Sequence, residues 1–274
     1  MKKVLVVLLV LSIGIFAIGC GGGDADKAEQ ETTKLVVGAT PVPHAEILEF
    51  VKPILAKQGI DLEIKEFTDY VQPNLALNDG ELDANYFQHL PYLEQFNADN
   101  DMDLTYTVSV HFEPVGLYSK SITSLDQIEN GAKIGVPSDP TNEARALLLL
   151  QDNGLITLKE GVELKATKVD IVDNPKNIEI IEMEAAQLAT SLPDMTAAVI
   201  NGNYALDAGL SISKAIVSEG KDSIAAKTFG NILAIRPGDE DRPEIKALSD
   251  VLNSDEVRAF IEEKYAESGF VPTF

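Results

Sequence analysis

Short apolar runs and stretches of helical spacing alternate along most of this chain. Residues 34–40 form an apolar run that ends at turn residues, which predicts a buried strand. Residues 44–58 then place an apolar side chain at every third or fourth position and end at a glycine, which predicts a helix. Pro53 inside that helix predicts a kink or a local break. A strand over 61–67 and a short helix over 70–80 follow in the same order.

The second half of the chain continues the alternation without an internal sequence repeat. Asp139 and Pro140 have the residue types of an N-cap and a first helical position, and they predict a helix that runs to Gly154. Two helices are expected within 243–267. Further strands are predicted at 104–110, 114–119, 132–137, 177–184, 195–200 and 229–236. Alternating segments of this kind predict an α/β fold with mainly parallel sheets flanked by helices and with ligands at the carboxyl ends of the strands.

The first twenty residues have the pattern of an export signal. Lys2 and Lys3 precede an apolar run over 4–18, which is shorter than the roughly 20 apolar residues of a spanning helix. An uncleaved membrane anchor is the alternative. The segment "FAIGC" resembles the lipobox of bacterial lipoproteins, which implies a signal peptide over 1–19 and a lipid, such as palmitate, on Cys20.

The segment that follows Cys20 is polar and rich in glycine, and it predicts a flexible tether over 20–33. Because Cys20 is the one cysteine of the chain, no disulfide forms within it. The chain holds 44 acidic and 22 basic residues, for a net charge of −22. Such a charge repels nucleic acid and anionic lipid headgroups, so we expect neither as a partner.

No sequence motif indicates catalysis. A GxSxG elbow, a phosphate-binding loop and a GxGxxG turn are all missing from the sequence, so we expect neither an enzyme nor a cofactor. The three histidines, His44, His89 and His111, offer a rival function as a zinc-binding lipoprotein. Their spacing matches no metal motif, and a structural role is favoured for His44 and His111.

Small-molecule binding is better supported by residue types. Arg145 sits in an otherwise apolar helix, where a buried guanidinium needs an anion such as a ligand carboxylate. A position on the polar face of that helix is the alternative. Asn201 and Asn231 lie at or within predicted strands and offer both donors and acceptors, although Asn201 also suits a turn. The segment "DANYFQHLPY" (83–92) concentrates aromatic side chains around His89. These side chains could form the wall of a pocket or belong to the ordinary core.

Several long motifs in order resemble the NLPA family of lipoproteins, the methionine-binding components of ATP-binding-cassette importers. They are "GATPVPHAEIL", "FTDYVQPNLAL", "DGELDANYFQHLPYL", "IGVPSDPTNEARALLLLQ", "VDNPKNIEIIEMEAAQL" and "NGNYA". The resemblance runs from Lys34 to about Glu240. It implies a two-lobed, type II-like periplasmic-binding-protein fold with a hinge and a central ligand cleft. We expect one lobe from 34–119 with 226–274, and the other from 120–225.

The resemblance also implies which residues bind the ligand. Tyr70, Phe87 and His89 match the family's wall around the methionine side chain, and Arg145 matches its carboxylate-binding arginine. The asparagines Asn201 and Asn231 match further ligand-binding positions. Two residues depart from the family pattern, because Gly202 stands where threonine is usual and Gly230 where a larger residue is usual. Both departures suggest a roomier pocket.

The sequence therefore predicts a lipid-anchored protein on the extracytoplasmic side of the cell membrane. It would capture L-methionine by hinge closure and deliver it to a permease and its ATPase. A related amino acid or a methionine-containing dipeptide is the alternative ligand, and a surface adhesin without a small ligand is a further alternative function.

Overall fold

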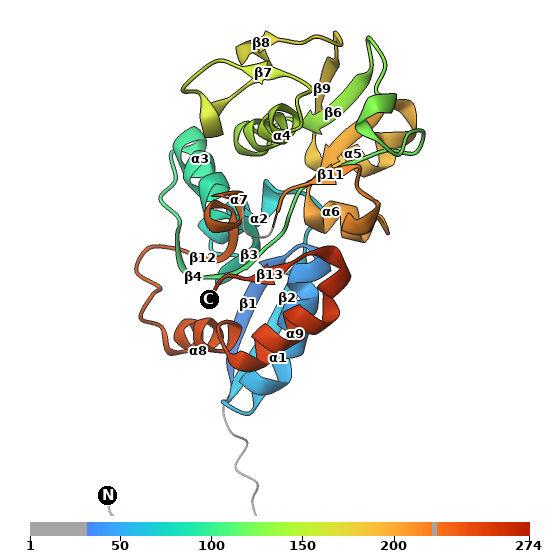
Figure 1. The fold of residues 1–274 in the computed structure, drawn as a ribbon. Helices are drawn as coiled ribbons and strands as arrows, with labels where there is room; N and C mark the ends of the chain where they lie inside the picture. The colour runs from blue at the N-terminus through green and yellow to red at the C-terminus, as the bar shows by residue number, and fades with distance from the viewer. Residues whose placement is uncertain (1–31, 221–223) are drawn as a thin grey trace, which may run out of the picture. The chain divides into compact units, whose positions relative to one another are not determined.

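Two mixed β-sheets, each covered by helices, form the part of the chain that the computed structural model describes, residues 32–220 and 224–274 (Figure 1). The predicted signal peptide, Cys20 and most of the tether lie outside these residues.

The first sheet has six strands in the order β13-β4-β12-β3-β1-β2. Their bounds are β1 Thr33–Ala39, β2 Ile60–Glu66, β3 Ala84–His89, β4 Thr105–Phe112, β12 Gly230–Ile235 and β13 Val271–Pro272. Successive side chains of a strand point to opposite faces, so each sheet face has its own core. Leu233 packs in the cluster with α1, α8 and α9, whereas Ile232 packs in the cluster with α2 and α3. These helices are α1 Glu46–Ala56, α2 Gln72–Asn78, α3 Leu90–Asn100, α8 Pro243–Leu252 and α9 Asp255–Lys264.

The second sheet has five strands in the order β11-β5-β10-β6-β9. Their bounds are β5 Gly116–Tyr118, β6 Lys133–Pro137, β9 Glu179–Met183, β10 Ala197–Ile200 and β11 Val217–Ser218. Val199 of β10 packs in one core with α4, and its neighbour Ala198 packs in another with α5 and α6. The helices are α4 Pro140–Asp152, α5 Ala185–Ser191, α6 Gly202–Asp207 and α7 Ile224–Thr228, and a small hairpin joins β7 Thr157–Leu158 to β8 Ile171–Asp173.

Single helical turns fill several of the connections. A π-turn, Pro41–Ala45, precedes α1, and 3₁₀ turns occupy Leu125–Gln127, Glu163–Lys165, Lys168–Asp170, Leu192–Asp194, Ile212–Lys214 and Ala266–Ser268.

The prediction of mainly parallel sheets is only partly right. Strands β1, β2 and β3 pair in parallel, as do β6, β9 and β10. Strand β12, however, runs antiparallel to both of its neighbours, β3 and β4. The reason is that β12 brings the chain back from the second sheet, so it runs opposite to the strands that lead outward.

Most of the predicted elements are present, with boundaries shifted by a few residues. Asp139 caps α4, because its carboxylate accepts a hydrogen bond from the Asn142 N–H. Helix α1 runs without a break from Glu46 to Ala56 although it contains Pro53. The local break that was one of the two expectations at this proline does not occur. The segment that ends at His89 is β3, a fully buried strand beside β1 and β12.

The chain changes sheet between Phe112 and Gly116 and changes back between Ser218 and Gly230. The lobe boundaries predicted at residues 119 and 225 remain a prediction, although β5 already belongs to the second sheet.

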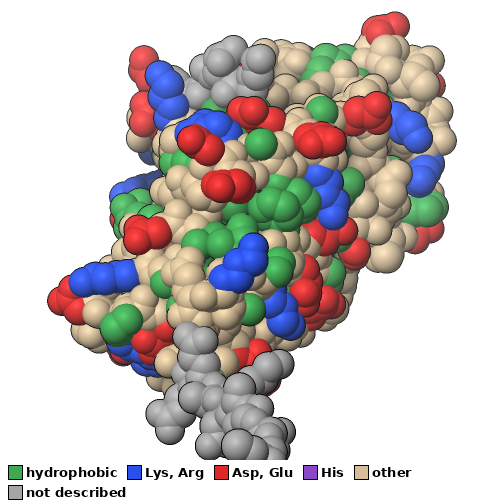
Figure 2. Space-filling model, turned by 90° about the horizontal axis from the view of Figure 1, so that it is seen from below, with side chains coloured by type: hydrophobic (Ala, Val, Ile, Leu, Met, Phe, Trp, Pro, Cys, Tyr) green, Lys and Arg blue, Asp and Glu red, His purple; other side chains and the backbone are tan. Residues whose placement is uncertain are grey.

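The described surface carries charges of both signs. On the face in Figure 2, acidic and basic side chains are interspersed, and no described histidine is visible there. All three histidines are buried. Across residues 32–220 and 224–274, every helix is too short or too polar to cross a membrane.

Replacement of a core side chain tests this packing. Leu48→Ala in α1 removes a fully buried side chain, so we expect the free energy of unfolding to fall by about 2–5 kcal/mol. The matched control, Val172→Ala, alters a side chain that is 64% exposed and should change the free energy by less than about 0.5 kcal/mol. Urea unfolding followed by circular dichroism measures both. Equal losses in the two variants would contradict the assigned core.

Candidate functional site

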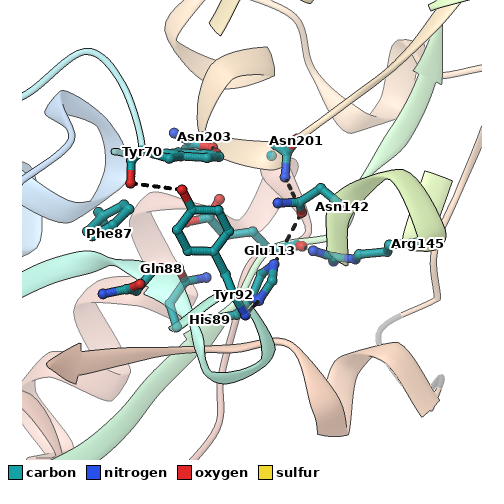
Figure 3. A pocket seen from close by; sticks show the side chains of 12 residues that line it. Tyr70, Phe87, Gln88, His89, Tyr92, Glu113, Asn142, Arg145, Asn201 and Asn203 are labelled. Carbon is teal, nitrogen blue, oxygen red and sulfur yellow. Dashed lines mark hydrogen bonds between the residues drawn. The ribbon is translucent and has the colours of Figure 1, made fainter. Parts of the chain in front are cut away.

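A cavity of about 330 Å³ lies where the two sheets face each other (Figure 3). Strands β3 and β12 and helix α3 contribute side chains from the first sheet, and α4 and α6 contribute from the second. The lining residues are Tyr70, Phe87, Gln88, His89, Tyr92, Glu113, Asn142, Arg145, Asn201, Gly202, Asn203 and Asn231.

Asn142 joins the two sides of the cavity. Its Oδ1 accepts hydrogen bonds from His89 Nε2 at 3.1 Å and from Asn201 Nδ2 at 2.8 Å (Figure 3). Its Nδ2 donates to both carboxylate oxygens of Asp139, which fixes the orientation of the amide. His89 belongs to the first sheet and Asn142 to the helix that covers the second, so this bond crosses the cavity.

His89 also caps helix α3. Its Nδ1 accepts the Tyr92 N–H at 3.1 Å, so the ring proton is on Nε2, the atom that donates to Asn142. Burial, and after it the nearby Arg145 charge, lower the pKa of His89 to about 3. His89 is therefore a neutral, oriented wall residue.

An aromatic wall closes one end of the cavity. Tyr70 lies with its ring 5.8 Å from the rings of Phe87 and Tyr92 and 4.9 Å from that of Tyr204. The Tyr70 hydroxyl donates to Asn203 Oδ1 at 2.6 Å, which is a second bond across the cavity. The Tyr92 hydroxyl donates to the Tyr70 carbonyl oxygen (Figure 3). The wall is thus apolar toward the cavity and hydrogen-bonded at its rim.

Arg145 is buried and already paired with a carboxylate of its own chain. Nε and Nη2 donate to the two carboxylate oxygens of Glu219, at 2.8 and 2.5 Å. Nη2 also donates to the Glu113 carbonyl oxygen at 2.6 Å, and the guanidinium lies 4.5 Å from the Phe229 ring. Nη1 makes no hydrogen bond to another described residue. The alternative of an exposed Arg145 is wrong.

Glu113 is the one carboxylate among the residues that line the cavity. Its Oε1 lies 2.8 Å from His111 Nε2 and 3.2 Å from His44 Nε2. The Tyr86 hydroxyl bonds His111 Nδ1 at 2.5 Å, and the Thr40 hydroxyl bonds His44 Nδ1 at 2.7 Å. The two hydroxyls can donate to the Nδ1 atoms and Glu113 Oε1 can accept from the Nε2 atoms, so we assign the proton of both imidazoles to Nε2.

The groups of this cluster titrate far from their ordinary values. Burial lowers the pKa of His44 to about 4 and that of His111 to about 3. Burial raises the pKa of Glu113, whereas the His44 ring, the Asn203 N–H and the Arg145 charge favour its ionised form. At neutral pH the histidines therefore hold Glu113 without neutralising it.

Two asparagines present amide groups to the cavity. Asn201 Oδ1 is buried and has no hydrogen-bond partner, although its Nδ2 is bonded to Asn142. Asn231 Oδ1 accepts from His44 Nε2 at 3.2 Å. An unpartnered buried carbonyl oxygen is costly, so Asn201 Oδ1 is suited to a donor on a ligand.

The two glycines that depart from the family pattern do not enlarge the cavity. A Cβ at Gly202 would lie 2.8 Å from Glu113 Cβ and 2.9 Å from a Phe270 ring carbon. A Cβ at Gly230 would lie 2.4 Å from Ser109 Oγ. The space beside each glycine is filled by the protein's own side chains, so the expectation of a roomier pocket is wrong.

Every residue that the sequence proposed for the site lines this cavity: Tyr70, Phe87, His89, Arg145, Asn201 and Asn231. Their contact with a ligand remains a prediction. Sequence reasoning missed Asn142, which lies one helical turn before Arg145 and follows its cap Asp139 by three residues. It also missed Glu113, and it did not assign Tyr92, which lines the cavity, to the site.

The three histidines do not form one metal site. Among the described residues, His44 and His111 come together with Glu113, and their potential ligand atoms lie within 4.8 Å of one another. His89 is not part of that group and bonds Asn142 instead. The hydrogen bonds within the group account for each imidazole without a metal ion.

Comparison with known proteins shows the family of the chain. The family model described as NlpA lipoprotein matches residues 35–274. The chain belongs to the NlpA lipoprotein family. The methionine-binding lipoprotein MetQ of Bacillus subtilis is 41% identical over 270 residues, 97% of each protein.

Two solved structures show the fold of this family. A periplasmic substrate-binding protein of an ABC transporter from Coxiella burnetii is 43% identical, with a TM-score of 0.81 over 87% of this chain and all of that one. A nutrient-binding protein from Burkholderia cenocepacia, solved bound to methionine, is 42% identical, with a TM-score of 0.83 over 88% of this chain and all of that one. The two-lobed periplasmic-binding-protein fold is therefore confirmed.

The protonation states are directly measurable. We expect NMR spectra of the imidazoles to show all three histidines neutral, with the proton on Nε2, from pH 8 to pH 5. Because each pKa is lowered, the unfolded chain binds protons below about pH 6.5 that the folded chain does not. The histidine contribution to stability is complete above pH 6.5 and declines as the pH falls toward 4. A histidine that titrates near 6.5 in the folded protein would contradict its assigned burial.

Proposed function

We propose that this NlpA lipoprotein binds L-methionine on the extracytoplasmic side of the membrane and delivers it to the permease of an ABC importer. The observation that carries the proposal is the Burkholderia cenocepacia relative, which was solved bound to methionine and shares the fold over 88% of this chain. The name of the Bacillus subtilis relative supports the same ligand.

The cavity offers what each part of methionine requires. The Arg145 guanidinium and the amide groups of Asn201 and Asn231 line the cavity and suit the charged end of an amino acid. Tyr70, Phe87 and Tyr92 form an aromatic surface for the side chain, where a thioether sulfur gains from contact with ring edges. A related amino acid of similar shape would use the same groups.

Capture would proceed by closure of the two lobes around the ligand. Bonds from His89 to Asn142, from Tyr70 to Asn203 and from Tyr204 to the Thr68 carbonyl join the two sides in the closed form. A ligand that contacts both sides binds the closed form more tightly and so increases its population. The relatives are named as binding proteins, and we infer that the ligand is released to the permease unchanged.

Attachment to the membrane would use Cys20. The lipobox-like "FAIGC" segment precedes it, and the family description is that of lipoproteins. A lipid on Cys20 would keep the binding domain close to the permease and its ATPase, with the glycine-rich tether between them.

Loss of the Arg145 guanidinium should abolish tight binding. Replacement of Arg145 alone would leave Glu219 buried and unpaired, so the test uses Arg145→Met together with Glu219→Gln. We expect a loss of about 2–5 kcal/mol in methionine binding, which is roughly 30-fold to several thousand-fold in Kd. Isothermal titration calorimetry measures it.

The matched control is Glu219→Gln alone, which keeps the guanidinium in the cavity. We expect its Kd to lie much closer to that of the unmodified protein. Thermal unfolding of both variants checks that they fold. Near-normal methionine affinity in the folded double variant would contradict the role assigned to Arg145.

Removal of the lipidation site should change where the protein is found in the cell without changing its affinity for methionine. In a bacterial host that expresses the full chain, Cys20→Ser should move the protein from the membrane fraction to the soluble exported fraction and abolish incorporation of labelled palmitate. Methionine affinity should not change, because the binding site lies within residues 32–274. Unchanged membrane association would contradict the anchor at Cys20.

A further inference from the structure

We propose that Glu113 binds the ammonium group of the ligand and thereby restricts this pocket to free α-amino acids with an unblocked amine. The inference rests on the proposed function and adds to it a specificity-determining residue that the family resemblance did not supply.

The first observation is that Glu113 is a carboxylate without a cationic partner. It is 5% exposed and borders the cavity, and the Arg145 guanidinium is paired with Glu219. The donors that reach Oε1 are two imidazoles, His44 and His111, which are neutral near pH 7. Burial raises the pKa of Glu113, so a cation that enters the cavity beside it would stabilise the ionised carboxylate.

The second observation is that the protein fixes this carboxylate in place. The Tyr86 and Thr40 hydroxyls orient the two imidazoles, and these in turn hold Glu113 Oε1. Such a chain of bonds sets the position of the acceptor before a ligand arrives, which lowers the entropy cost of binding. Asn201 Oδ1, buried and unpartnered in the same cavity, is a second acceptor for the remaining N–H groups of an ammonium.

The third observation is the glycine at position 202. A Cβ there would approach Glu113 Cβ to 2.8 Å and Oε2 to 3.2 Å, so any side chain at 202 would displace the Glu113 carboxylate. The absence of a side chain at Gly202 therefore leaves room for Glu113 in the cavity wall.

The charges are also arranged for one ligand class. Arg145 Nη2 donates to the backbone oxygen of Glu113 at 2.6 Å, so the guanidinium lies against the same residue whose side chain supplies the carboxylate. A free α-amino acid carries its carboxylate and ammonium on one carbon and matches this adjacent pair. A dipeptide separates the two charges by a peptide unit and matches it poorly.

The test removes the amine of the ligand and the carboxylate of Glu113, first separately and then together. Calorimetry measures Kd for L-methionine and for its analogue without the amine, 4-(methylthio)butanoate, with the unmodified protein and with Glu113→Gln. We expect Glu113→Gln to raise the Kd for methionine by at least 30-fold and to change the Kd for the analogue by less than threefold. The control Glu143→Gln removes an equally buried carboxylate outside the cavity and should bind both ligands normally.

Two further ligands and one further variant sharpen the result. N-acetyl-L-methionine and glycyl-L-methionine should bind the unmodified protein at least tenfold more weakly than methionine. Gly202→Ala should displace the carboxylate and weaken methionine binding with little effect on the amine-free analogue. If Glu113→Gln does not fold, Gly202→Ala provides the same comparison.

Four outcomes would overturn the inference. They are normal methionine affinity in Glu113→Gln, equal losses for both ligands in that variant, tighter binding of the dipeptide than of methionine, and stoichiometric zinc in the purified protein that is lost in Glu113→Gln. The first three leave the proposed function intact. Failure of the unmodified protein to bind methionine would overturn the proposed function, and this inference with it.

Discussion

The closed pocket depends on the hydrogen bonds of one amide, that of Asn142. Its Oδ1 accepts from His89 on one side of the cavity and from Asn201 on the other, while Asp139 holds its Nδ2. His89, Asn142 and Asn201 are buried, so hydrogen bonds that are lost here are not replaced by solvent. The Asn142 amide therefore joins polar groups from both sides of the cavity, and Asn201 Oδ1 is left without a partner.

The same constraint explains why the site is built from neutral groups. Burial in this cavity makes charged imidazoles costly, and all three histidines act as oriented Nε2–H donors. The two other ionisable side chains in the wall, Arg145 and Glu113, differ in their surroundings. Arg145 has an internal counterion in Glu219, whereas the two imidazoles beside Glu113 are neutral at pH 7. Burial raises the pKa of Glu113, and the ligand ammonium that we propose there would stabilise its ionised form.

How much of the site was predictable depended on the kind of evidence. Residue types favoured small-molecule binding and left Arg145 either buried or on the polar face of its helix, and the family resemblance supplied the six lining residues. Asn142 was missed because its partners across the cavity lie 53 and 59 positions away. Glu113 was missed because its neighbour His111 acquires its role together with His44, which comes from a distant segment. No local pattern records partners so far apart in the chain. The mixed character of the sheets was missed for the same reason, since strand direction depends on where the chain returns.

The sequence by itself determined the elements, the export and lipidation signals, and the family, because these depend on local periodicity and on contiguous motifs. Only the tertiary structure decided what each buried polar group faces. It assigned Glu219 to Arg145, placed Glu113 between His44 and His111, and showed that Gly202 makes room for a carboxylate and not for a larger ligand. Those outcomes rest on contacts between residues distant in the chain, and packing in three dimensions is what brings such residues together.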